Sequence, residues 1–215
     1  MSKLDELSQA VEAGKAKLVP DLVQAALDEG NSATDVLNAG MIDAMDRVGE
    51  KFKNGDIFVP EMMIAARAMK TGVEILKPYL ASSGSAFIGK YVMGTVYGDL
   101  HDIGKNLVIM MIEAAGFEVI DLGIDVPVEK FVEAVENDPE VKIVGVSALL
   151  TTTMPAMKET VEALNESAVR DRFKIMVGGA PVTQEFADEI KADVYTADAA
   201  SAAQKAKELV LGLAS

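Results

Sequence analysis

Apolar side chains recur at helical spacing through the first 80 residues of the chain. Steps of three or four predict helices that begin near Leu4, Pro20, Ser32 and Pro60, the third of which ends near Gly55. In the fourth helix the apolar positions are Met62, Ala66, Met69, Val73, Leu76 and Leu80. A narrow stripe of this kind is typical of an antiparallel bundle, so we predict a four-helix bundle.

From Lys90 onward, short apolar runs alternate with amphipathic stretches. The runs predict strands at 91–96, 118–122, 143–147, 174–177 and 193–195, with helices at 103–115, 128–136, 154–165, 183–190 and 199–211. This alternation is typical of a parallel sheet with right-handed crossovers. We therefore expect an α/β domain, flavodoxin-like or Rossmann-like, with five strands in the order 2-1-3-4-5. A ligand of such a fold lies beyond the carboxyl ends of strands 1 and 3, where the winding reverses.

The change of pattern predicts two domains. Residues 1–87 form the helical bundle cap and its linker, and residues 88–215 form the α/β domain. The linker is the small, polar run Ala81-Ser82-Ser83-Gly84-Ser85, whose composition is typical of a flexible connection and a possible hinge.

Composition narrows the classes of function. The chain has 215 residues, half of them hydrophobic, with 20 Lys and Arg against 34 Asp and Glu, for a net charge of −14. This acidity argues against nucleic acids and anionic membranes as partners. The absence of cysteine excludes disulfides, thiolate nucleophiles and thiolate metal sites. No run approaches the ~20 apolar residues of a membrane span and no signal-peptide pattern is present, so we expect a cytoplasmic location.

Chemistry-bearing residues gather in three loops that follow predicted strands. The loop after the first strand, 98–106, holds His101, the only histidine of the chain. The loop after the third strand, 147–153, is rich in hydroxyls, and Gly178-Gly179 follow the fourth strand. Because parallel strands end at the same edge of a sheet, we expect these three loops to lie together.

Three common sites of this fold do not fit these loops. A response-regulator receiver needs a phosphate-accepting Asp after strand 3, where this chain has Ser147. A flavodoxin-like phosphate loop is rich in Ser, Thr and Gly, whereas the first loop holds Asp99, His101 and Asp102. The Gly-rich turn of a dinucleotide fold is absent from this place.

The Asp99-x-His101 spacing suits a metal cofactor. A carboxylate two residues before an imidazole can accept a hydrogen bond from one ring nitrogen, which leaves the other nitrogen free to bind a metal. One histidine cannot hold a bare ion. The pattern therefore favours a metal that arrives with its own equatorial ligands in a macrocycle.

The ordered set Asp99-x-His101-x-x-Gly104, Ser147-x-Leu149 and Gly178-Gly179 resembles the cobalamin-binding signature of corrinoid methyl-carrier proteins and of the cobalamin modules of methionine synthase. The resemblance covers nearly the whole chain. The segments 52–60 and 65–69 resemble the end of the helical cap that precedes the cobalamin domain in that family.

This resemblance implies cobalamin or a related corrinoid, bound base-off/His-on. His101 would be the axial cobalt ligand in place of the cofactor's own base, Asp99 would hydrogen-bond His101, and Thr153 would supply the third member of the relay. Ser147 and Thr151 would bond corrin side chains or the nucleotide tail. The implied cofactor contacts are Gly98, Asp99, Leu100, His101, Asp102, Ile103, Gly104, Ser147, Leu149, Thr151, Thr153, Gly178, Gly179 and Ala199.

The resemblance also has implications for the nucleotide tail of the cofactor and for the helical cap. The nucleotide tail would enter a slot lined by small residues, with Ala199 near the buried base. Phe52 and Val59 would shield the upper, methyl-bearing face of the corrin. Asp102 serves equally well as a helix N-cap, and Asn38 stands where the methionine synthase module has an acidic residue.

The function that the resemblance implies is methyl transport, without catalysis by the chain alone. The cobalt would cycle between Co(I) and methyl-Co(III) as it carries the group from a substrate-specific methyltransferase to a second methyltransferase, which acts on tetrahydrofolate, a pterin or a thiol. A reductive activator would rescue Co(II). Methanol, methylamines, quaternary amines and aryl methyl ethers remain open as donors. The alternatives are a cobalamin-dependent sensor or repressor and the small subunit of a carbon-skeleton mutase. The acidity of the chain argues against the first, and the presence of the cap argues against the second.

Overall fold

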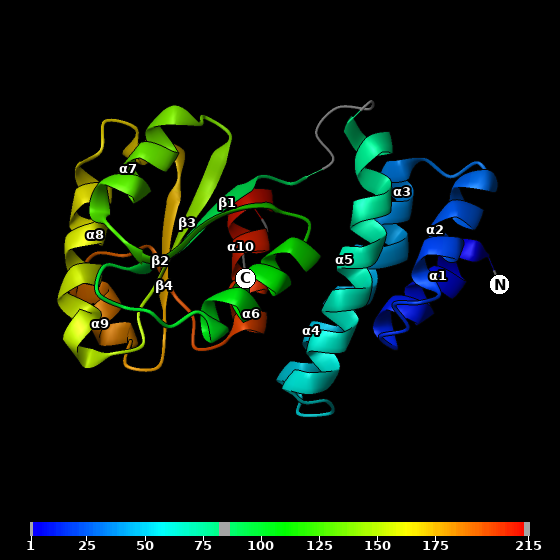
Figure 1. Cartoon of the computed structure of the whole chain (residues 1–215), viewed down its shortest axis with the longest axis horizontal. Coiled ribbons are helices and arrows are strands. Elements are labelled where there is room, and N and C mark those ends of the chain that lie inside the picture. Colours follow the sequence, from blue (N-terminus) through cyan, green and yellow to red (C-terminus); the bar gives the residue numbers. More distant parts are fainter. Residues whose placement is uncertain (1, 82–86, 213–215) are drawn as a thin grey trace. The chain divides into compact units, whose positions relative to one another are not determined.

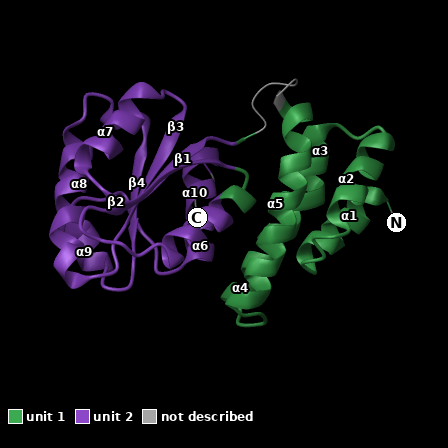
Figure 2. Ribbon diagram, viewed as in Figure 1, with its two compact units in different colours: residues 1–87, 113–116 green, residues 88–112, 117–215 purple. Residues whose placement is uncertain are grey.

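The structure is a computed structural model that describes residues 2–81 and 87–212 (Figure 1). It separates into two compact units, residues 1–87 with 113–116 and residues 88–112 with 117–215 (Figure 2). Residues 82–85 of the predicted linker lie outside the described residues. Each unit is described by itself below.

The first unit is helical. Its elements are α1 (Lys3–Glu12), α2 (Val19–Asp28), α3 (Ala33–Leu37), the π-helical segment η1 (Asn38–Ile42), α4 (Asp43–Lys53) and α5 (Val59–Ala81). The side chains of Ser2 and Ser32 cap α1 and α3 by accepting hydrogen bonds from amides of their first turns. The apolar stripes that predicted the helices line the core, where Leu7, Met41 and Met69 are buried.

The predicted third helix runs through α3, η1 and α4, so it contains a single π turn between two α-helical parts. Within this turn Gly40 lies against α1, because a Cβ atom at Gly40 would come within 2.8 Å of the Leu7 side chain. The wider turn therefore occurs where a glycine allows two helices to approach closely.

The second unit is a five-stranded parallel sheet in the order β2-β1-β3-β4-β5. The strands are β1 (Lys90–Val96), β2 (Glu118–Val126), β3 (Val141–Ser147), β4 (Lys174–Gly178) and β5 (Val194–Tyr195). The helices are α6 (Ile103–Ala114), α7 (Val128–Asn137), α8 (Met154–Glu166), α9 (Gln184–Glu189) and α10 (Ala199–Leu211), with short 3-10 turns at Thr151–Thr153 and Arg170–Arg172. The predicted fold class and strand order are confirmed.

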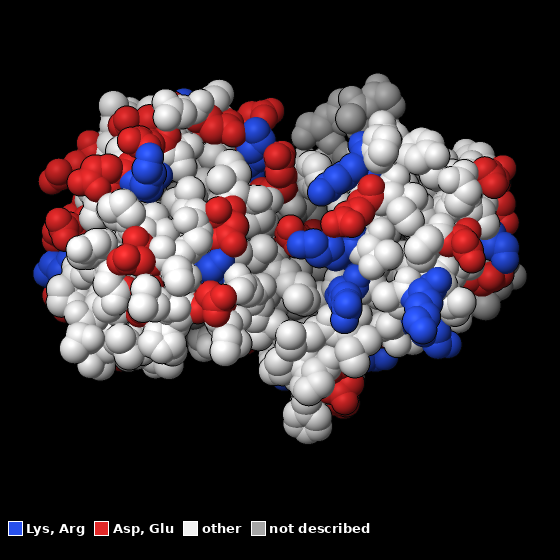
Figure 3. Space-filling model, viewed as in Figure 1, with Lys and Arg blue, Asp and Glu red and all other residues white. Residues whose placement is uncertain are grey.

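Helices cover both faces of the sheet, with α6 and α10 on one face and α7, α8 and α9 on the other (Figure 1). The inner strands are buried almost throughout, as the apolar runs of β1 and β3 predicted. Carboxylates are spread over the visible surface of this unit (Figure 3), in agreement with the net charge of −14. Within residues 2–81 and 87–212, no helix is both long and apolar enough to cross a membrane.

The turn after β4 packs closely on the chain that follows β3. Gly179 has a φ of +134°, and a Cβ atom there would overlap the backbone carbonyl oxygen of Ala148. The neighbouring carbonyl of Gly178 accepts a hydrogen bond from the Ala148 amide at 3.3 Å. Only glycine fits this position, because both the backbone conformation and the space exclude a side chain.

We expect Gly179→Ala to destabilise the protein by more than the ~1–2 kcal/mol that a left-handed backbone alone costs an L-residue. Gly212→Ala is the matched control, because Gly212 also has a positive φ, +67°, but its Cβ would have nothing within 4 Å. Denaturant unfolding of the full chain measures both. Equal losses for the two variants would contradict the close packing of Gly179 on Ala148.

Candidate functional site

The carboxyl ends of β1 and β3 bring two loops together at the point where the strand order reverses. The loop after β1 carries Asp99 and His101, and the loop after β3 ends in the 3-10 turn that carries Thr153. The sequence predicted that these two loops lie together at one edge of the sheet, and in the structure hydrogen bonds join them.

The Asp99 carboxylate is the centre of these bonds and is completely buried. Its Oδ1 accepts the Nδ1–H of His101 at 2.8 Å and the backbone N–H of His101 at 3.1 Å. Its Oδ2 accepts the backbone N–H of Leu149 at 2.8 Å and the hydroxyl of Thr153 at 2.7 Å. A single carboxylate thus joins the two loops.

These bonds decide the charge of Asp99. Burial by itself raises the pKa of this carboxyl, but the Leu149 amide, the Thr153 hydroxyl and the His101 ring together lower the pKa well below its ordinary value. Asp99 is therefore ionised at neutral pH and can only accept hydrogen bonds. Consequently Nδ1 of His101 carries the proton, and Nε2 keeps a free lone pair.

The His101 ring is held at the surface of the site. Its side chain is 49% exposed, while the hydroxyl of the buried Thr95 donates to the His101 carbonyl at 2.9 Å. The ring is thus fixed through Nδ1 and through its own backbone. Nε2 is the atom left for a ligand.

Large apolar side chains around the ring are exposed. On the two loops and the first turn of α6 they are Tyr97, Leu100, Ile103, Leu149 and Leu150. An apolar rim with one nitrogen ligand suits a large, flat cofactor that contains a metal. The described residues hold no cluster of three or more His, Asp or Glu side chains able to bind an ion.

The other predicted contact residues lie at the same edge. Gly98 and Asp102 are exposed in the loop after β1, Gly104 is exposed in the first turn of α6, and Thr151 is exposed in the 3-10 turn. Ser147 is the half-buried last residue of β3. The carbonyl and the carboxylate of Asp102 accept hydrogen bonds from Asn106, as expected of a residue that precedes a helix. Gly178 and Gly179 follow at the end of β4, and the buried Ala199 begins α10.

In the helical unit, Phe52 is half-buried on α4 and Val59 is 38% exposed at the start of α5. Phe58, which the sequence analysis did not select, is 69% exposed directly before Val59. Its place in the same Phe-Val-Pro run could have indicated it. The shielding role of Phe52 and Val59 stays a prediction.

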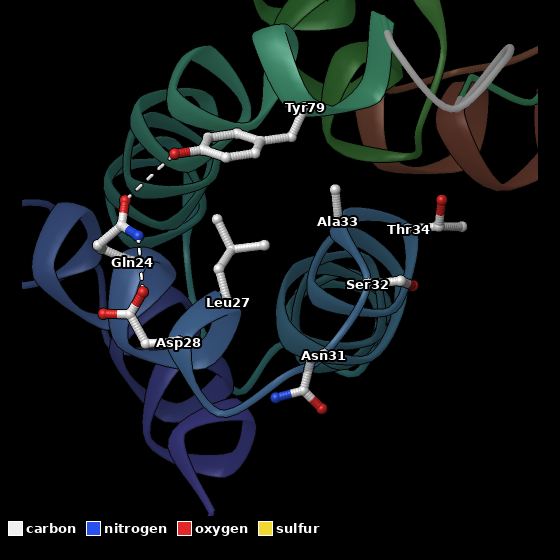
Figure 4. A pocket seen from close by; sticks show the side chains of 8 residues that line it. All are labelled: Gln24, Leu27, Asp28, Asn31, Ser32, Ala33, Thr34 and Tyr79. Atoms are coloured by element: carbon white, nitrogen blue, oxygen red, sulfur yellow. Dashed lines mark hydrogen bonds between the residues drawn. The ribbon is translucent and has the colours of Figure 1, made fainter.

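A separate pocket of about 400 Å³ lies within the helical unit, between α2, the start of α3 and the end of α5 (Figure 4). Its polar side chains bond to one another, since the Tyr79 hydroxyl donates to Gln24 and the Gln24 amide donates to Asp28. None of the predicted contact residues lines it.

We expect Asp99→Asn to destabilise the fold at neutral pH, because an amide cannot accept all of these bonds as a carboxylate does. The folded-state pKa of Asp99 is lowered, so its stabilisation is fully present above the unfolded-state value of about 3.9 and is lost as the pH falls below it. The stability gap between wild type and Asp99→Asn should therefore shrink below about pH 4. Urea unfolding across this range measures the gap, and a gap independent of pH would contradict the ionised relay.

Comparisons with known proteins agree with this geometry. A family model described as a B12 binding domain matches residues 89–206, and a second B12 binding domain model matches residues 3–77. A corrinoid protein of Desulfitobacterium hafniense is 44% identical over 213 residues, which is 98% of each chain. Dimethylamine corrinoid protein 3 of Methanosarcina acetivorans is 42% identical over 97% of this chain and 92% of its own.

Solved structures agree as well. The methanol:cobalamin methyltransferase complex MtaBC of Methanosarcina barkeri contains a chain that is 32% identical with a TM-score of 0.84, covering 98% of this chain and 80% of its own. A cobalamin-binding protein of Desulfitobacterium hafniense is 33% identical with a TM-score of 0.77, covering 96% of this chain and 98% of its own. On these matches, and on the site just described, the chain belongs to the family of corrinoid proteins with a B12 binding domain.

Proposed function

We propose that this chain carries a methyl group on the cobalt of a bound corrinoid. The group would pass from a substrate-specific methyltransferase to a second methyltransferase that acts on tetrahydrofolate, a pterin or a thiol, with a reductive activator as a third partner. The observation that carries the proposal is the Thr153–Asp99–His101 relay, which presents Nε2 of a half-exposed ring beside an apolar rim.

The chain's own residues would bind the corrinoid base-off/His-on. Nε2 of His101 would be the lower cobalt ligand, and the bond from Nδ1–H to the ionised Asp99 would make the ring a stronger electron donor. Leu100, Ile103 and Leu149 would cover the lower face of the macrocycle with apolar surface. When bound, the cobalt supplies the methyl-transfer chemistry.

The relay would keep its orientation whether or not the ring binds the cofactor. Thr153 and the Leu149 amide lower the pKa of Asp99, so this carboxylate stays an acceptor for Nδ1–H of His101.

Small and polar residues at the sheet edge support the placement of the nucleotide tail. Gly178 and Gly179 end β4 without side chains, and Ala199 opens α10 with a methyl group. Ser147 and Thr151 offer hydroxyls at the end of β3 and in the turn after it.

The partners follow from the names of two relatives. One similar structure is a complex that contains a methanol:cobalamin methyltransferase, and other relatives are dimethylamine corrinoid proteins. Because the names of these relatives point to different donors on similar chains, selection of the donor would belong to the partner enzyme. Their names support a small methylated alcohol or amine as the donor class of this chain.

The single histidine makes the ligand assignment directly testable. We expect the Co(II) form of the full chain, reconstituted with cobalamin, to show electron-spin splitting from one strong axial nitrogen. Labelling the protein with 15N-histidine should convert the triplet splitting into a doublet, because His101 is the only labelled side chain. His101→Ala should lose this signal and bind corrinoid about 10- to 100-fold more weakly.

Asp171→Asn is the control, since it changes an exposed carboxylate of the same unit outside both the relay and the predicted cofactor contacts. Splitting that is unaffected by the label would mean that the cofactor's own base remains on the metal, and the assignment of His101 would be wrong.

The upper ligand separates methyl transport from the two alternatives. We expect the purified holo-protein to carry a methyl group or an exchangeable water, and to accept and release the methyl group when a methyltransferase pair is added. Visible spectra and mass spectrometry of the extracted corrinoid measure the ligand. Stable retention of an adenosyl group would instead favour a sensor or a mutase subunit.

A further inference from the structure

The carboxyl-terminal half of β2 does not run regularly beside β1. Met93 pairs with Asp121, but Gly94 pairs with Gly123 and Val96 with Val126, so β2 contains two more residues than β1 over this stretch. Bulges in parallel pairs are rare, and bulges re-aim side chains near functional sites. Asp121 stands directly before the first bulge and Asp125 lies within the second, and the two carboxylates bond to residues on either side of His101.

The second bulge contains Asp125, which lies between Gly123 and Val126. Its Oδ1 accepts the backbone N–H of Gly98 at 2.7 Å, and its own backbone N–H donates to the carbonyl of Asp99 at 3.0 Å. These two bonds hold Gly98 and Asp99, which precede His101 by three and two residues. Asp125 therefore fixes the backbone from which the relay carboxylate projects.

The backbone of Asp125 is unusual for a residue with a side chain. Its φ is +53°, and among the described residues only Lys191 shares a positive φ without being glycine. Asp and Asn tolerate this conformation better than other side chains, but glycine costs least. An aspartate at this position is explained by the bond that its carboxylate makes to Gly98.

Asp121, directly before the first bulge, bonds to the first turn of α6, which follows the loop. Its Oδ1 accepts the Gly123 amide at 2.9 Å, and its two oxygens accept the Lys105 ammonium at 2.6 and 2.7 Å. Lys105 is 3% exposed although it stands in the first turn of α6, where the helix dipole disfavours a positive charge. The carboxylate of Asp121 is what stabilises the ammonium there.

From this geometry we infer that Asp121 and Asp125 act as a clamp, here called the β2 clamp, that positions His101 for its ligand. Asp125 holds the start of the loop at Gly98 and Asp99, and Asp121 holds its end through Lys105. Both are positioning residues, because neither is hydrogen-bonded to the imidazole: Asp125 acts through the loop backbone, and Asp121 acts through the Lys105 side chain. The inference rests on the proposed function, in which His101 binds cobalt.

Two substitutions, each with a matched control, test whether the clamp positions the loop. Asp125→Gly keeps the backbone conformation and the N–H bond to Asp99 but removes the acceptor for Gly98. Asp125→Asn keeps an oxygen acceptor and a residue that tolerates positive φ, so it is the matched control. Lys105→Met removes the ammonium that bonds to Asp121 and keeps a side chain of similar length. Lys105→Arg is its control.

The first measurement needs no cofactor. In the 15N-labelled, corrinoid-free full chain, we expect Asp125→Gly to speed hydrogen exchange of the Gly98 amide by about tenfold or more, while Asp125→Asn keeps most of the protection. Gly98 is exposed, so this bond is the source of its protection. Unchanged exchange in Asp125→Gly would overturn the clamp, whatever the cobalt ligand proves to be.

The second measurement reads the ring itself in the Co(II) protein. We expect Asp125→Gly and Lys105→Met to lower the fraction of cobalt that shows the His101 nitrogen splitting, and to weaken corrinoid binding less than His101→Ala does. Asp125→Asn and Lys105→Arg should restore the wild-type fraction, which a general loss of stability would not produce. Wild-type splitting in both clamp variants would overturn the inference.

The two proposals fail in different ways. If the wild-type protein lacks the histidine splitting, the proposed function fails and the exchange of the Gly98 amide still decides the clamp. If the wild-type protein shows the splitting and the clamp variants match it, the clamp alone fails.

Discussion

The site depends on one buried carboxylate with hydrogen-bond donors on both of its oxygens. Asp99 receives donors from its own loop through His101 and from the neighbouring loop through Leu149 and Thr153. These bonds outweigh the cost of burial and keep the group ionised, which in turn determines the tautomer of His101. The availability of the other ring nitrogen therefore follows from a charge that two neighbouring loops stabilise.

The doubly wound sheet explains why such a carboxylate can form here. Strands β1 and β3 are neighbours in space but are separated in the chain by a crossover through β2, so their loops meet only after the sheet has assembled. Gly179 lets the turn after β4 approach Ala148, next to the Leu149 amide that Asp99 needs. The bulges of β2 hold the same loop from its other side.

The sequence predicted the elements and strand order because apolar spacing reports them directly. It also predicted the Asp99–His101 bond, since the two residues are only two positions apart. Thr153 needed the family resemblance, because its bond to Asp99 spans 54 positions. Asp125 was missed because β2 was expected to end at residue 122. Gly123 and Asp125 look like turn residues, and their positive φ values, which drive the irregular pairing, do not show in apolar spacing.

The π turn in the helical unit suggests how this bundle tolerates changes of length. A π turn accommodates one residue more than an α-helical turn, and each residue of an α-helix turns it by about 100°. Deleting one residue between Asn38 and Ile42 would restore regular α-helix and leave Met45 and Val48 facing the core as they do now. In a plain helix the same deletion would rotate these side chains toward solvent. The segment is thus a place where one codon can be lost while the core-facing side chains of α4 keep their direction.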